Sequence, residues 1–343
     1  MQPITARALA RAIEVEDLVK TYPGGKTALN GISFAVERGE IYGFLGPNGS
    51  GKTTTVRILV TLLRATSGAA RVSGFDVGRM AGRVRQSIGY TAQATGVDDD
   101  LTVHEHLVLQ ALLHGLPPSR EQQRRIEALI DAFSLSEVAN ERASRLSGGL
   151  RRRLDVAQAI VHRPPVIFLD EPTIGLDPQS RGALWGFLRQ LSREGTTIFL
   201  TTQYLEEADR ACDRVAIIDG GWLVKEGTPA ALKEEVGEGR LRLTLANGAD
   251  PARAARALAV CPEVVNVEPG NPLVARVRSV GPSLAPVIRL LDEAGIGVAG
   301  VKTEQATLDD VFLRYTGQAP RAEALAASSV SSLFAAAHGR RRH

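Results

Sequence analysis

One stretch, residues 46–54, constrains the fold of this chain more than any other. It consists of Gly46, Pro47, Asn48, Gly49, Ser50, Gly51, Lys52, Thr53 and Thr54. This is the P-loop pattern, in which glycines, a lysine and a threonine follow a strand and open a helix. The apolar run 41–45 predicts a buried strand before it, and residues 55–59 predict a helix after it. The alternative, a glycine-rich turn with a chance lysine, is disfavoured by these matching flanks.

The residue types of this stretch suit the binding of phosphate. Glycines let successive backbone N–H groups curl around an anion, because a side chain would block the approach. The N-terminal end of the following helix directs its partial positive charge toward the same phosphates. We therefore expect Lys52 to reach the β- and γ-phosphate oxygens of a nucleotide, and the hydroxyl of Thr53 to bind Mg²⁺.

Length and composition bound the fold class. The 343 residues suffice for one large or two ordinary domains, and a hydrophobic fraction of 44% is typical of soluble α/β proteins. A net charge of +3 is too small to indicate nucleic-acid binding by bulk electrostatics. The two cysteines, Cys212 and Cys261, lie far apart, which fits a reducing, cytoplasmic setting. No window approaches 18 uninterrupted apolar residues, so we expect no membrane-spanning segment.

Ahead of the P-loop, residues 13–41 alternate between apolar and polar side chains, which predicts antiparallel strands. The turn between them contains Tyr22, Pro23 and two glycines. An aromatic side chain on a turn near a nucleotide site can stack on a purine through its π-face. Tyr22 can equally well cover the edge of the sheet, and its residue type alone does not decide between the two.

Between about residues 97 and 160, apolar residues recur with helical spacing, which predicts a helical subdomain inserted in an α/β domain. The strand before it is expected to end near the amide of Gln93. Ser147, Gly148 and Gly149 then lead into a helix, with Ser147 as N-cap and an uncovered N-terminus that can bind an anion. An ordinary turn is the alternative. We interpret the arginines 151–153 as a solvated helix face.

A fully apolar run, residues 166–169, predicts a strand inside a parallel sheet, and Asp170 and Glu171 follow it directly. Carboxyl ends of such strands are where α/β sheets bind ligands. Asp170 can hold Mg²⁺ through water, and Glu171 can orient and deprotonate an attacking water. Two acids on an exposed loop are the alternative, which the apolar strand disfavours because that strand end should be partly buried.

The remaining elements of this region are a helix over 181–194 and apolar strands over 196–202 and 214–219. Taken in order, the motifs resemble the ATP-binding subunit of ABC transporters over about residues 13–235. The motifs that carry the resemblance are the P-loop, Gln93 at a strand end, residues 146–149 (Leu-Ser-Gly-Gly), Asp170 with Glu171, residues 175–177 (Gly-Leu-Asp), and residues 201–203 (Thr-Thr-Gln).

This resemblance implies roles for residues in both halves of an ATP site. It makes Tyr22 the residue that stacks on adenine and Gln93 a contact to Mg²⁺ and water that couples to a partner. It makes residues 147–149 the signature that covers ATP bound by the opposite subunit.

The same resemblance makes Asp170 the second metal contact and Glu171 the catalytic base. It makes Asp177 a dimer contact and Gln203 the switch on the γ-phosphate. ATP and Mg²⁺ are the implied cofactors.

Two positions depart from the family pattern. Leu150 stands where the signature has glutamine, and Gln203 stands where the switch is usually histidine. Gln203 can still donate a hydrogen bond to a γ-phosphate, but it cannot carry a proton or a charge, so we expect slow turnover. Together with residues 204–209, both features resemble the daunorubicin-resistance branch of drug exporters.

Residues 238–317 differ in character from the ATP-binding domain expected over 13–237. Their pattern predicts the order β-α-β-β-α-β, a small α+β domain of ferredoxin-like type. Residues 306–313 resemble the closing helix of the same exporter branch. The tail, 318–343, is rich in alanine and serine and is expected to be disordered.

The sequence therefore predicts a P-loop NTPase, and the resemblance implies one of ABC type at the cytoplasmic face of the membrane. The resemblance implies a head-to-tail ATP-sandwich dimer with a second copy or a paralogue, driving a separate permease in drug or antibiotic efflux, with no nucleic acid involved. The competing hypothesis is a soluble ABC-type ATPase that acts on nucleic acid or ribosomes. Such proteins usually carry two ATPase halves or long coiled coils, whereas this chain has a single P-loop and no sustained heptads.

Overall fold

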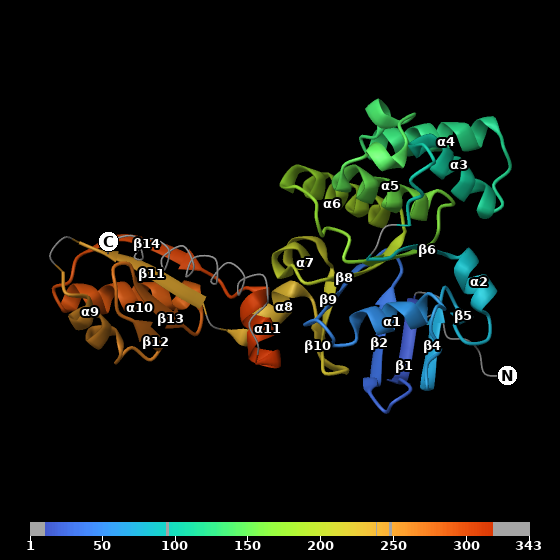
Figure 1. The fold of residues 1–343 in the computed structure, drawn as a ribbon. Coiled ribbons are helices and arrows are strands. Elements are labelled where there is room, and N and C mark those ends of the chain that lie inside the picture. The colour runs from blue at the N-terminus through green and yellow to red at the C-terminus, as the bar shows by residue number, and fades with distance from the viewer. Residues whose placement is uncertain (1–10, 94–95, 238, 247–248, 318–343) are drawn as a thin grey trace, which may run out of the picture. The chain divides into compact units, whose positions relative to one another are not determined.

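The computed structural model describes residues 11–317, except 94–95, 238 and 247–248. It forms two compact units, the first ending at Gly227 and the second beginning at Thr228 (Figure 1). We expected the boundary at residue 237, but helix α8 (Pro229–Val236) belongs to the second unit. There Arg314 donates a hydrogen bond to the Val236 carbonyl at 3.1 Å, which ties α8 to helix α11 (Leu308–Thr316). The expected tail, 318–343, lies outside the described residues.

A six-stranded sheet forms the centre of the first unit. Its strands, in spatial order, are β10 (Trp222–Gly227), β9 (Arg214–Asp219), β3 (Ile41–Leu45), β8 (Thr197–Thr202), β7 (Val166–Asp170) and β6 (Ile88–Thr91). All neighbours pair in parallel except β10, which forms an antiparallel hairpin with β9. Strands β3, β7 and β8 are buried along their whole length, which explains why their sequences are mostly apolar.

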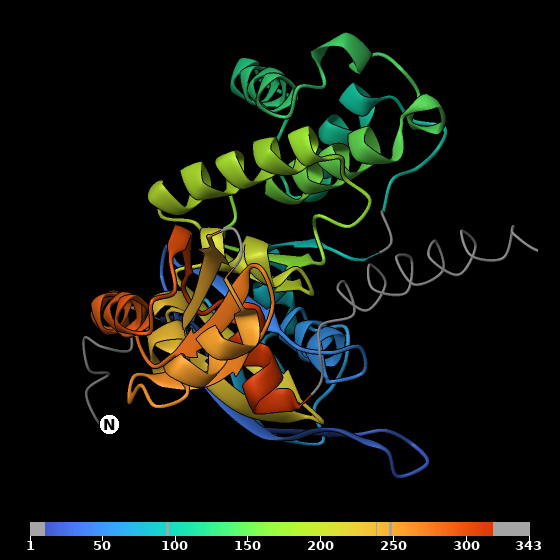
Figure 2. The same ribbon diagram turned by 90° about the vertical axis from the view of Figure 1, so that its left-hand side faces the viewer.

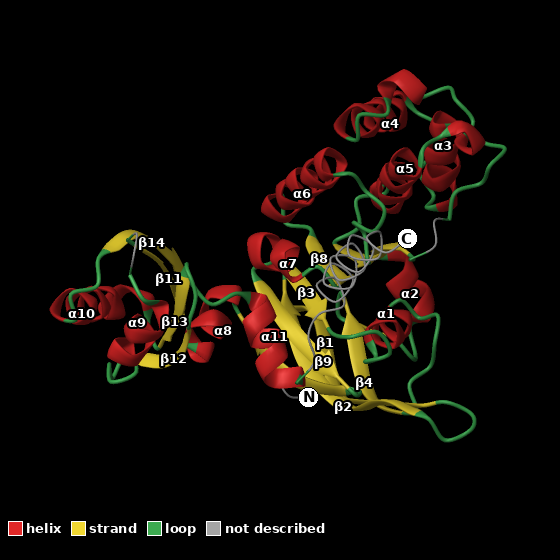
Figure 3. Ribbon diagram, turned by 60° about the vertical axis from the view of Figure 1, so that its left-hand side comes forward, coloured by secondary structure: helices red, strands yellow, loops and turns green. Residues whose placement is uncertain are grey.

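A second sheet of four antiparallel strands packs against this centre. Its strands are β2 (Thr27–Glu37), β1 (Arg11–Thr21), β4 (Ser67–Val72) and β5 (Phe75–Asp76). The inward residues of β1 and β2 share one apolar core with the central sheet, and Phe34 stacks on Tyr42 at 5.7 Å. Figure 3 shows the strands of both sheets side by side in the first unit. The antiparallel strands predicted from residues 13–41 are confirmed.

Helices α3, α4, α5 and α6 of the first unit begin at residues whose side chains cap them. Thr102 forms a capping box with Glu105 at the start of α3, and Asp177 accepts two backbone N–H groups ahead of a proline at the start of α6. The helices of this unit are α1 (Lys52–Leu59), α2 (Ala81–Gln86), α3 (Val103–Leu113), α4 (Arg120–Ala132), α5 (Gly148–Ile160), α6 (Pro178–Arg193) and α7 (Leu205–Ala211), with 3₁₀ turns at Ser136–Val138 and Ala143–Arg145.

Helices α3, α4 and α5 lie together at the end of the first unit remote from β1, β2 and β4 (Figures 1 and 2). Helix α5 packs against β6 and so joins this helical group to the central sheet. The helical character predicted for residues 97–160 is therefore confirmed for the part that the structure describes.

The second unit contains the six elements predicted for it, in the predicted order. They are β11 (Gly239–Leu245), α9 (Pro251–Leu258), β12 (Val264–Glu268), β13 (Leu273–Val277), α10 (Val280–Glu293) and β14 (Val298–Glu304). The sheet order is β12-β13-β11-β14, with every neighbour antiparallel, as in a split βαβ arrangement. Helices α9 and α10 cover one face of it (Figure 3), where Leu258 and Leu291 join an apolar core with Leu241.

Among the residues that the structure describes, no helix combines the length and apolar character needed to cross a lipid bilayer. Cys212 and Cys261 are buried free thiols.

Candidate nucleotide site

The P-loop connects the end of β3 to the start of α1 and lies tightly against its surroundings. A Cβ atom at Gly46 would lie 2.3 Å from the carbonyl oxygen of Ile218 in β9. One at Gly51 would lie 2.8 Å from the Ala28 carbonyl oxygen, and Gly51 has a φ of 115°. Both positions therefore require glycine, for close packing at Gly46 and for packing and backbone conformation at Gly51.

Lys52 is 5% exposed and turns back over the loop. Its ammonium group donates hydrogen bonds to the carbonyl oxygens of Gly46 at 2.6 Å and Pro47 at 3.1 Å. Burial lowers the pKa of Lys52, while the nearby carboxylates of Glu171 and Asp170 act in the opposite direction. The buried hydroxyl of Ser50 has no hydrogen-bond partner among the described residues. A buried cation, an unpaired hydroxyl and a glycine-rich loop fit a phosphate group.

These residues open onto a cleft of about 590 Å³ in the first unit. The predicted site residues that line it are Tyr22, Asn48, Gly49, Gly51, Lys52, Thr53, Thr54, Gln93 and Glu171. The hydroxyl of Tyr22 lies 3.2 Å from that of Thr54, so the turn between β1 and β2 reaches the P-loop helix. Tyr22 thus lines the cleft, and the ammonium nitrogen of Lys20 lies 5.3 Å from the centre of its ring. A cleft of this volume is within the usual range for small-molecule sites.

Asp170 and Glu171 stand at the carboxyl end of β7, as predicted. Asp170 is 2% exposed, and its carboxylate accepts a hydrogen bond from the Thr201 hydroxyl at 2.5 Å. The backbone N–H of Glu171 donates to the same hydroxyl at 3.0 Å and to the Thr201 carbonyl at 3.1 Å. Glu171 has a φ of 52°, a left-handed conformation that is unusual for a residue with a side chain. Strained backbone of this kind clusters at functional sites, where surrounding contacts enforce it.

The carboxyl group of Glu171 is buried, and this burial raises its pKa. Lys52 opposes that effect, and the neighbouring Asp170 carboxylate adds to it. A carboxylate with a raised pKa holds a proton more strongly, which suits a base that must accept one from water.

The predicted signature forms a second group that does not line the cleft of its own chain. Ser147 caps α5 by accepting the backbone N–H of Leu150 at 3.3 Å, and Ser147 and Gly148 are exposed. A Cβ atom at Gly149 would lie 3.9 Å from the Asp177 carboxylate, so the residue 175–177 turn is its neighbour. Asp177 is exposed and caps α6, and its hydrogen bonds to Ser180 lower its pKa.

Gln203 follows the last residue of β8 and is half-buried, but it is not among the residues that line the cleft. Its neighbour Tyr204 packs against Arg181 of α6, whose guanidinium lies 5.2 Å from the ring centre. Arg181 also donates a hydrogen bond to the Leu176 carbonyl at 3.4 Å and pairs with Glu207 at 3.1 Å. The segment after Gln203 is therefore held to the turn that ends in Asp177.

One sequence interpretation is wrong. Arg152, the middle residue of the three arginines taken as a solvated face, is 4% exposed and points into the protein. It donates hydrogen bonds to three backbone carbonyls and pairs with Asp155 at 3.1 Å. The three-residue spacing of Arg152 and Asp155 on one helix face is a signal that could have indicated a pair. Thr201 belongs to the 201–203 motif but was given no role in the site, because a threonine in an apolar strand does not indicate what it contacts.

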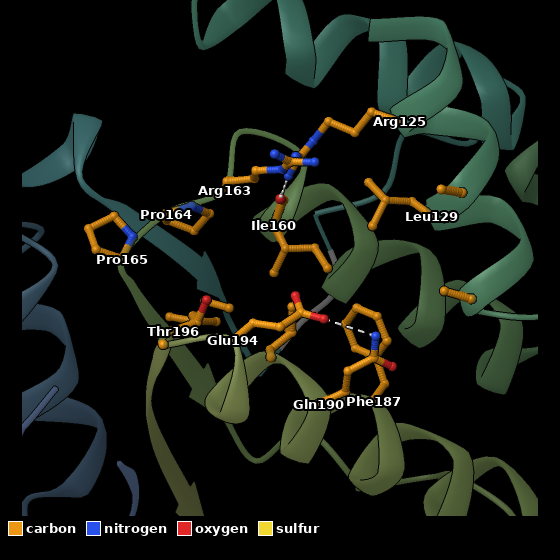
Figure 4. Close-up of a pocket in the computed structure, with 15 residues that line it drawn as sticks. Arg125, Leu129, Ile160, Arg163, Pro164, Pro165, Phe187, Gln190, Glu194 and Thr196 are labelled. Atoms are coloured by element: carbon orange, nitrogen blue, oxygen red, sulfur yellow. Dashed lines mark hydrogen bonds between the residues drawn. The ribbon is translucent and has the colours of Figure 1, made fainter. Parts of the chain in front are cut away.

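The structure contains a second cavity, of about 650 Å³, between α4 and the C-terminal part of α6 (Figure 4). Arg125 and Arg163 lie together at one side of it, and Glu194 lies on another. Leu129, Ile160 and Phe187 supply apolar walls. None of the predicted site residues lines this cavity, so it is separate from the P-loop cleft.

The fold and the cleft together define a P-loop nucleotide-binding cassette. Residues 29–174 match the family model described as ABC transporter. The chain is 43% identical over 308 residues to the daunorubicin/doxorubicin resistance ATP-binding protein DrrA of Streptomyces peucetius, covering 90% of this chain and 93% of that one. It is 38% identical over 308 residues to the Nod factor export ATP-binding protein I of Paraburkholderia xenovorans, covering 90% and 97%.

A solved ATP-binding subunit of an ABC transporter superposes with a TM-score of 0.62 at 30% identity, covering 66% of this chain and 93% of that chain. The chain therefore belongs to the ATP-binding subunits of ABC transporters, and it is an ATPase whose hydrolysis is coupled to transport. These similarities favour the transporter hypothesis over a soluble ATPase that acts on nucleic acid or ribosomes.

Proposed function

We propose that this chain is the ATP-hydrolysing subunit of an exporter for amphipathic drugs or antibiotics. The observation that carries the ATPase part is the single cleft that gathers Lys52, Thr53, Gln93 and Glu171. The outward direction is supported by the relatives, whose names refer to daunorubicin and doxorubicin resistance and to Nod factor export.

The roles that we propose for residues in and beside the cleft are those that the family resemblance implies. The ring of Tyr22 stacks on the adenine, and the P-loop amides with Lys52 hold the β- and γ-phosphates. Glu171 orients the attacking water and takes its proton. Thr53, Gln93 and Asp170 would hold Mg²⁺, which would neutralise charge on the phosphates. Gln203 donates a hydrogen bond toward the γ-phosphate and so acts as a switch without changing its own charge.

The signature belongs to the ATP site of a second subunit in this proposal. Ser147, Gly148 and Asp177 are exposed, and none of them lines the cleft of its own chain. A head-to-tail dimer, with a second copy or with a paralogous subunit, brings the uncovered N-terminus of α5 against the γ-phosphate in the partner's cleft. Each ATP is then held between a P-loop and a signature.

A mixing experiment tests this arrangement. In a Glu171→Gln background, which should retain ATP, one variant carries Lys52→Ala and the other carries Ser147→Arg. A dimer of two identical variant subunits has both composite sites damaged. A mixed dimer keeps one intact pair, formed by the P-loop of the Ser147→Arg subunit and the signature of the Lys52→Ala subunit. In an equal mixture with random pairing, half of the dimers are mixed, and each mixed dimer has one intact site of two. We therefore expect the mixture to retain about a quarter of the ATP of the parent dimer after gel filtration, and each variant alone to retain little. A mixture that retains no more ATP than the separate variants would contradict the sandwich.

We further propose that the subunit works peripherally at the cytoplasmic face of the membrane, on a separate permease contacted through the helical group near residues 93–106. Purification from native membranes in mild detergent should recover a polytopic membrane protein in constant ratio. Recovery of nucleic acid or ribosomes instead would contradict the proposal.

The proposed cargo is tested by measuring how much daunorubicin cells accumulate. Cells that express the chain with its permease should accumulate less daunorubicin, and the Lys52→Ala variant should abolish the difference. Equal accumulation with both forms would remove this class of cargo from the proposal.

A further inference from the structure

Arg152 and Asp155 connect the helix that follows the signature to two segments of the P-loop cleft. Arg152 lies in α5, which begins immediately after Ser147. Its guanidinium donates to the Ala92 carbonyl at 2.6 Å, the Asp170 carbonyl at 2.8 Å and the Pro172 carbonyl at 3.2 Å. Ala92 precedes Gln93, and the other two acceptors flank Glu171. A single side chain is thus bound next to two of the predicted catalytic and metal-contacting residues.

Asp155 lies one turn further along α5 and completes the arrangement. It pairs with Arg152 at 3.1 Å, and its other oxygen accepts the backbone N–H of Gly96 at 3.2 Å. Ala92 and Gly96 lie on the two sides of Gln93 in the sequence. Both sides of the segment that carries Gln93 are therefore bound to α5 by this one buried pair.

The burial of this pair is a reason to look for a role other than stability. Burial lowers the pKa of Arg152 and raises that of Asp155, because removing either charge from water is unfavourable. A buried ion pair is often no more stabilising than apolar residues of similar volume. Arg152 differs from an apolar residue in fixing the directions of three backbone carbonyls at once.

We infer that Arg152 and Asp155 are positioning residues that hold Gln93 and Glu171 in register with α5. A displacement of the signature end of α5 therefore moves Gln93 and the residues around Glu171 together. All the hydrogen bonds of Arg152 and Asp155 described here lie within one chain. A connection from this pair to ATP bound by the partner subunit, through the signature end of α5, rests on the ATP-sandwich dimer proposed above.

The test uses a double variant, Arg152→Met with Asp155→Leu, which removes the pair without leaving a buried charge unmatched. The matched control is Arg151→Gln. Arg151 is the preceding residue of α5 and contacts the Ala143 carbonyl and Asp99, which flank neither Gln93 nor Glu171. Arg152→Lys, which keeps the charge but not the fork of donors, is the conservative comparison.

Hydrogen exchange in the absence of nucleotide measures how firmly the backbone around Gln93 and Glu171 is held. We expect backbone amides of residues 88–98 and 170–174 to exchange about tenfold faster or more in the double variant, with residues 46–59 unchanged. Turnover should fall about tenfold or more with KM and the affinity for a fluorescent ATP analogue nearly constant, since misplaced catalytic groups lower kcat. The exchange rates and the turnover of the Arg152→Lys variant should lie between those of the double variant and those of the wild type.

Two results would overturn the inference. One is a folded double variant with wild-type exchange around Gln93 and wild-type turnover. The other is an equal effect of Arg151→Gln, which would indicate a general disturbance of α5. Because the exchange measurement needs neither nucleotide nor dimer, failure of the sandwich and failure of this positioning role give different results.

Discussion

The hydroxyl of Thr201 donates a 2.5 Å hydrogen bond to the carboxylate of Asp170. The two residues are direct partners in the parallel pairing of β7 and β8, so the sheet register sets this contact. The same hydroxyl accepts the backbone N–H of Glu171 at 3.0 Å. One side chain on β8 thus orients an acid at the end of β7 and anchors the strained backbone of the next acid.

Replacing Thr201 by valine, which has nearly the same shape, should lower kcat at least about tenfold. A hydrogen bond to a charged group contributes ~1.5–3 kcal/mol, and ~1.4 kcal/mol corresponds to a factor of ten in rate. Steady-state hydrolysis of ATP at several Mg²⁺ concentrations measures this, and Thr201→Ser should restore most of the rate. An unchanged kcat in the valine variant would mean that the carboxylates are oriented by other contacts.

Glu171→Gln should lower kcat by about 10²–10⁴-fold, the usual contribution of a general base, while ATP still binds. Because burial raises the pKa of Glu171, the wild-type rate should fall on acidification through a pKa above 4.5. The variant has no such group, so its residual rate should lack that acid limb. Pre-steady-state hydrolysis from pH 5 to 8 checks both effects. Glu194→Gln, an exposed carboxylate at the second cavity, is the control that should keep the wild-type profile.

The parts of the fold and of the site that could be predicted from sequence are those that depend on neighbouring residues in the chain. The P-loop, its flanking strand and helix, and the six elements of the second unit were predicted from contiguous residues. Arg152 was not, because its acceptors lie 18, 20 and 60 residues away in the chain. Helix α8 was grouped wrongly for the same reason, since its partner Arg314 is 78 residues distant. Gly46 was predicted as a phosphate-loop glycine, but only the structure explains it by the approach of Ile218.

Gln203 supplies a third prediction. Gln203→Leu removes its hydrogen-bonding groups at similar volume and should lower kcat about tenfold or more, with the affinity for ATP changed much less. Gln203→His restores the usual family residue and should hydrolyse ATP at least as fast as the wild type. Single-turnover hydrolysis measured beside equilibrium binding separates the two quantities. If the leucine variant turned over like the wild type, Gln203 would have no part in catalysis.

Phe199 lies at the centre of the aromatic core of the first unit. Its ring lies 5.4 Å from that of Phe44, 5.5 Å from Phe168 and 5.7 Å from Tyr42. Phe199→Ala should therefore lower the free energy of unfolding by ~3–5 kcal/mol. Chemical denaturation measures the loss. Leu62→Ala is the control, because Leu62 is 62% exposed and exposed substitutions change stability by about 0.5 kcal/mol or less.

His162 makes the stability of the first unit depend on pH. Its ring stacks on that of His114 at 3.5 Å, and one ring nitrogen lies 3.0 Å from the Ile88 carbonyl oxygen. Burial first, and then the neighbouring His114, lower the pKa of His162 from 6.5 to about 4. Between these values the unfolded chain binds a proton that the folded chain does not, so acidification favours unfolding.

We therefore expect Tm to fall as the pH decreases from about 6.5 toward 4, by less than the full shift implies because His162 is partly exposed. His162→Gln should lower Tm at pH 7.5, because the substitution removes the stack on His114. It should also flatten the dependence of Tm on pH between about 6.5 and 4. His104→Gln, a change outside the stack, should leave the slope as it is in the wild type. If His162→Gln retained the wild-type slope, the proton uptake on unfolding would have to be assigned to other groups.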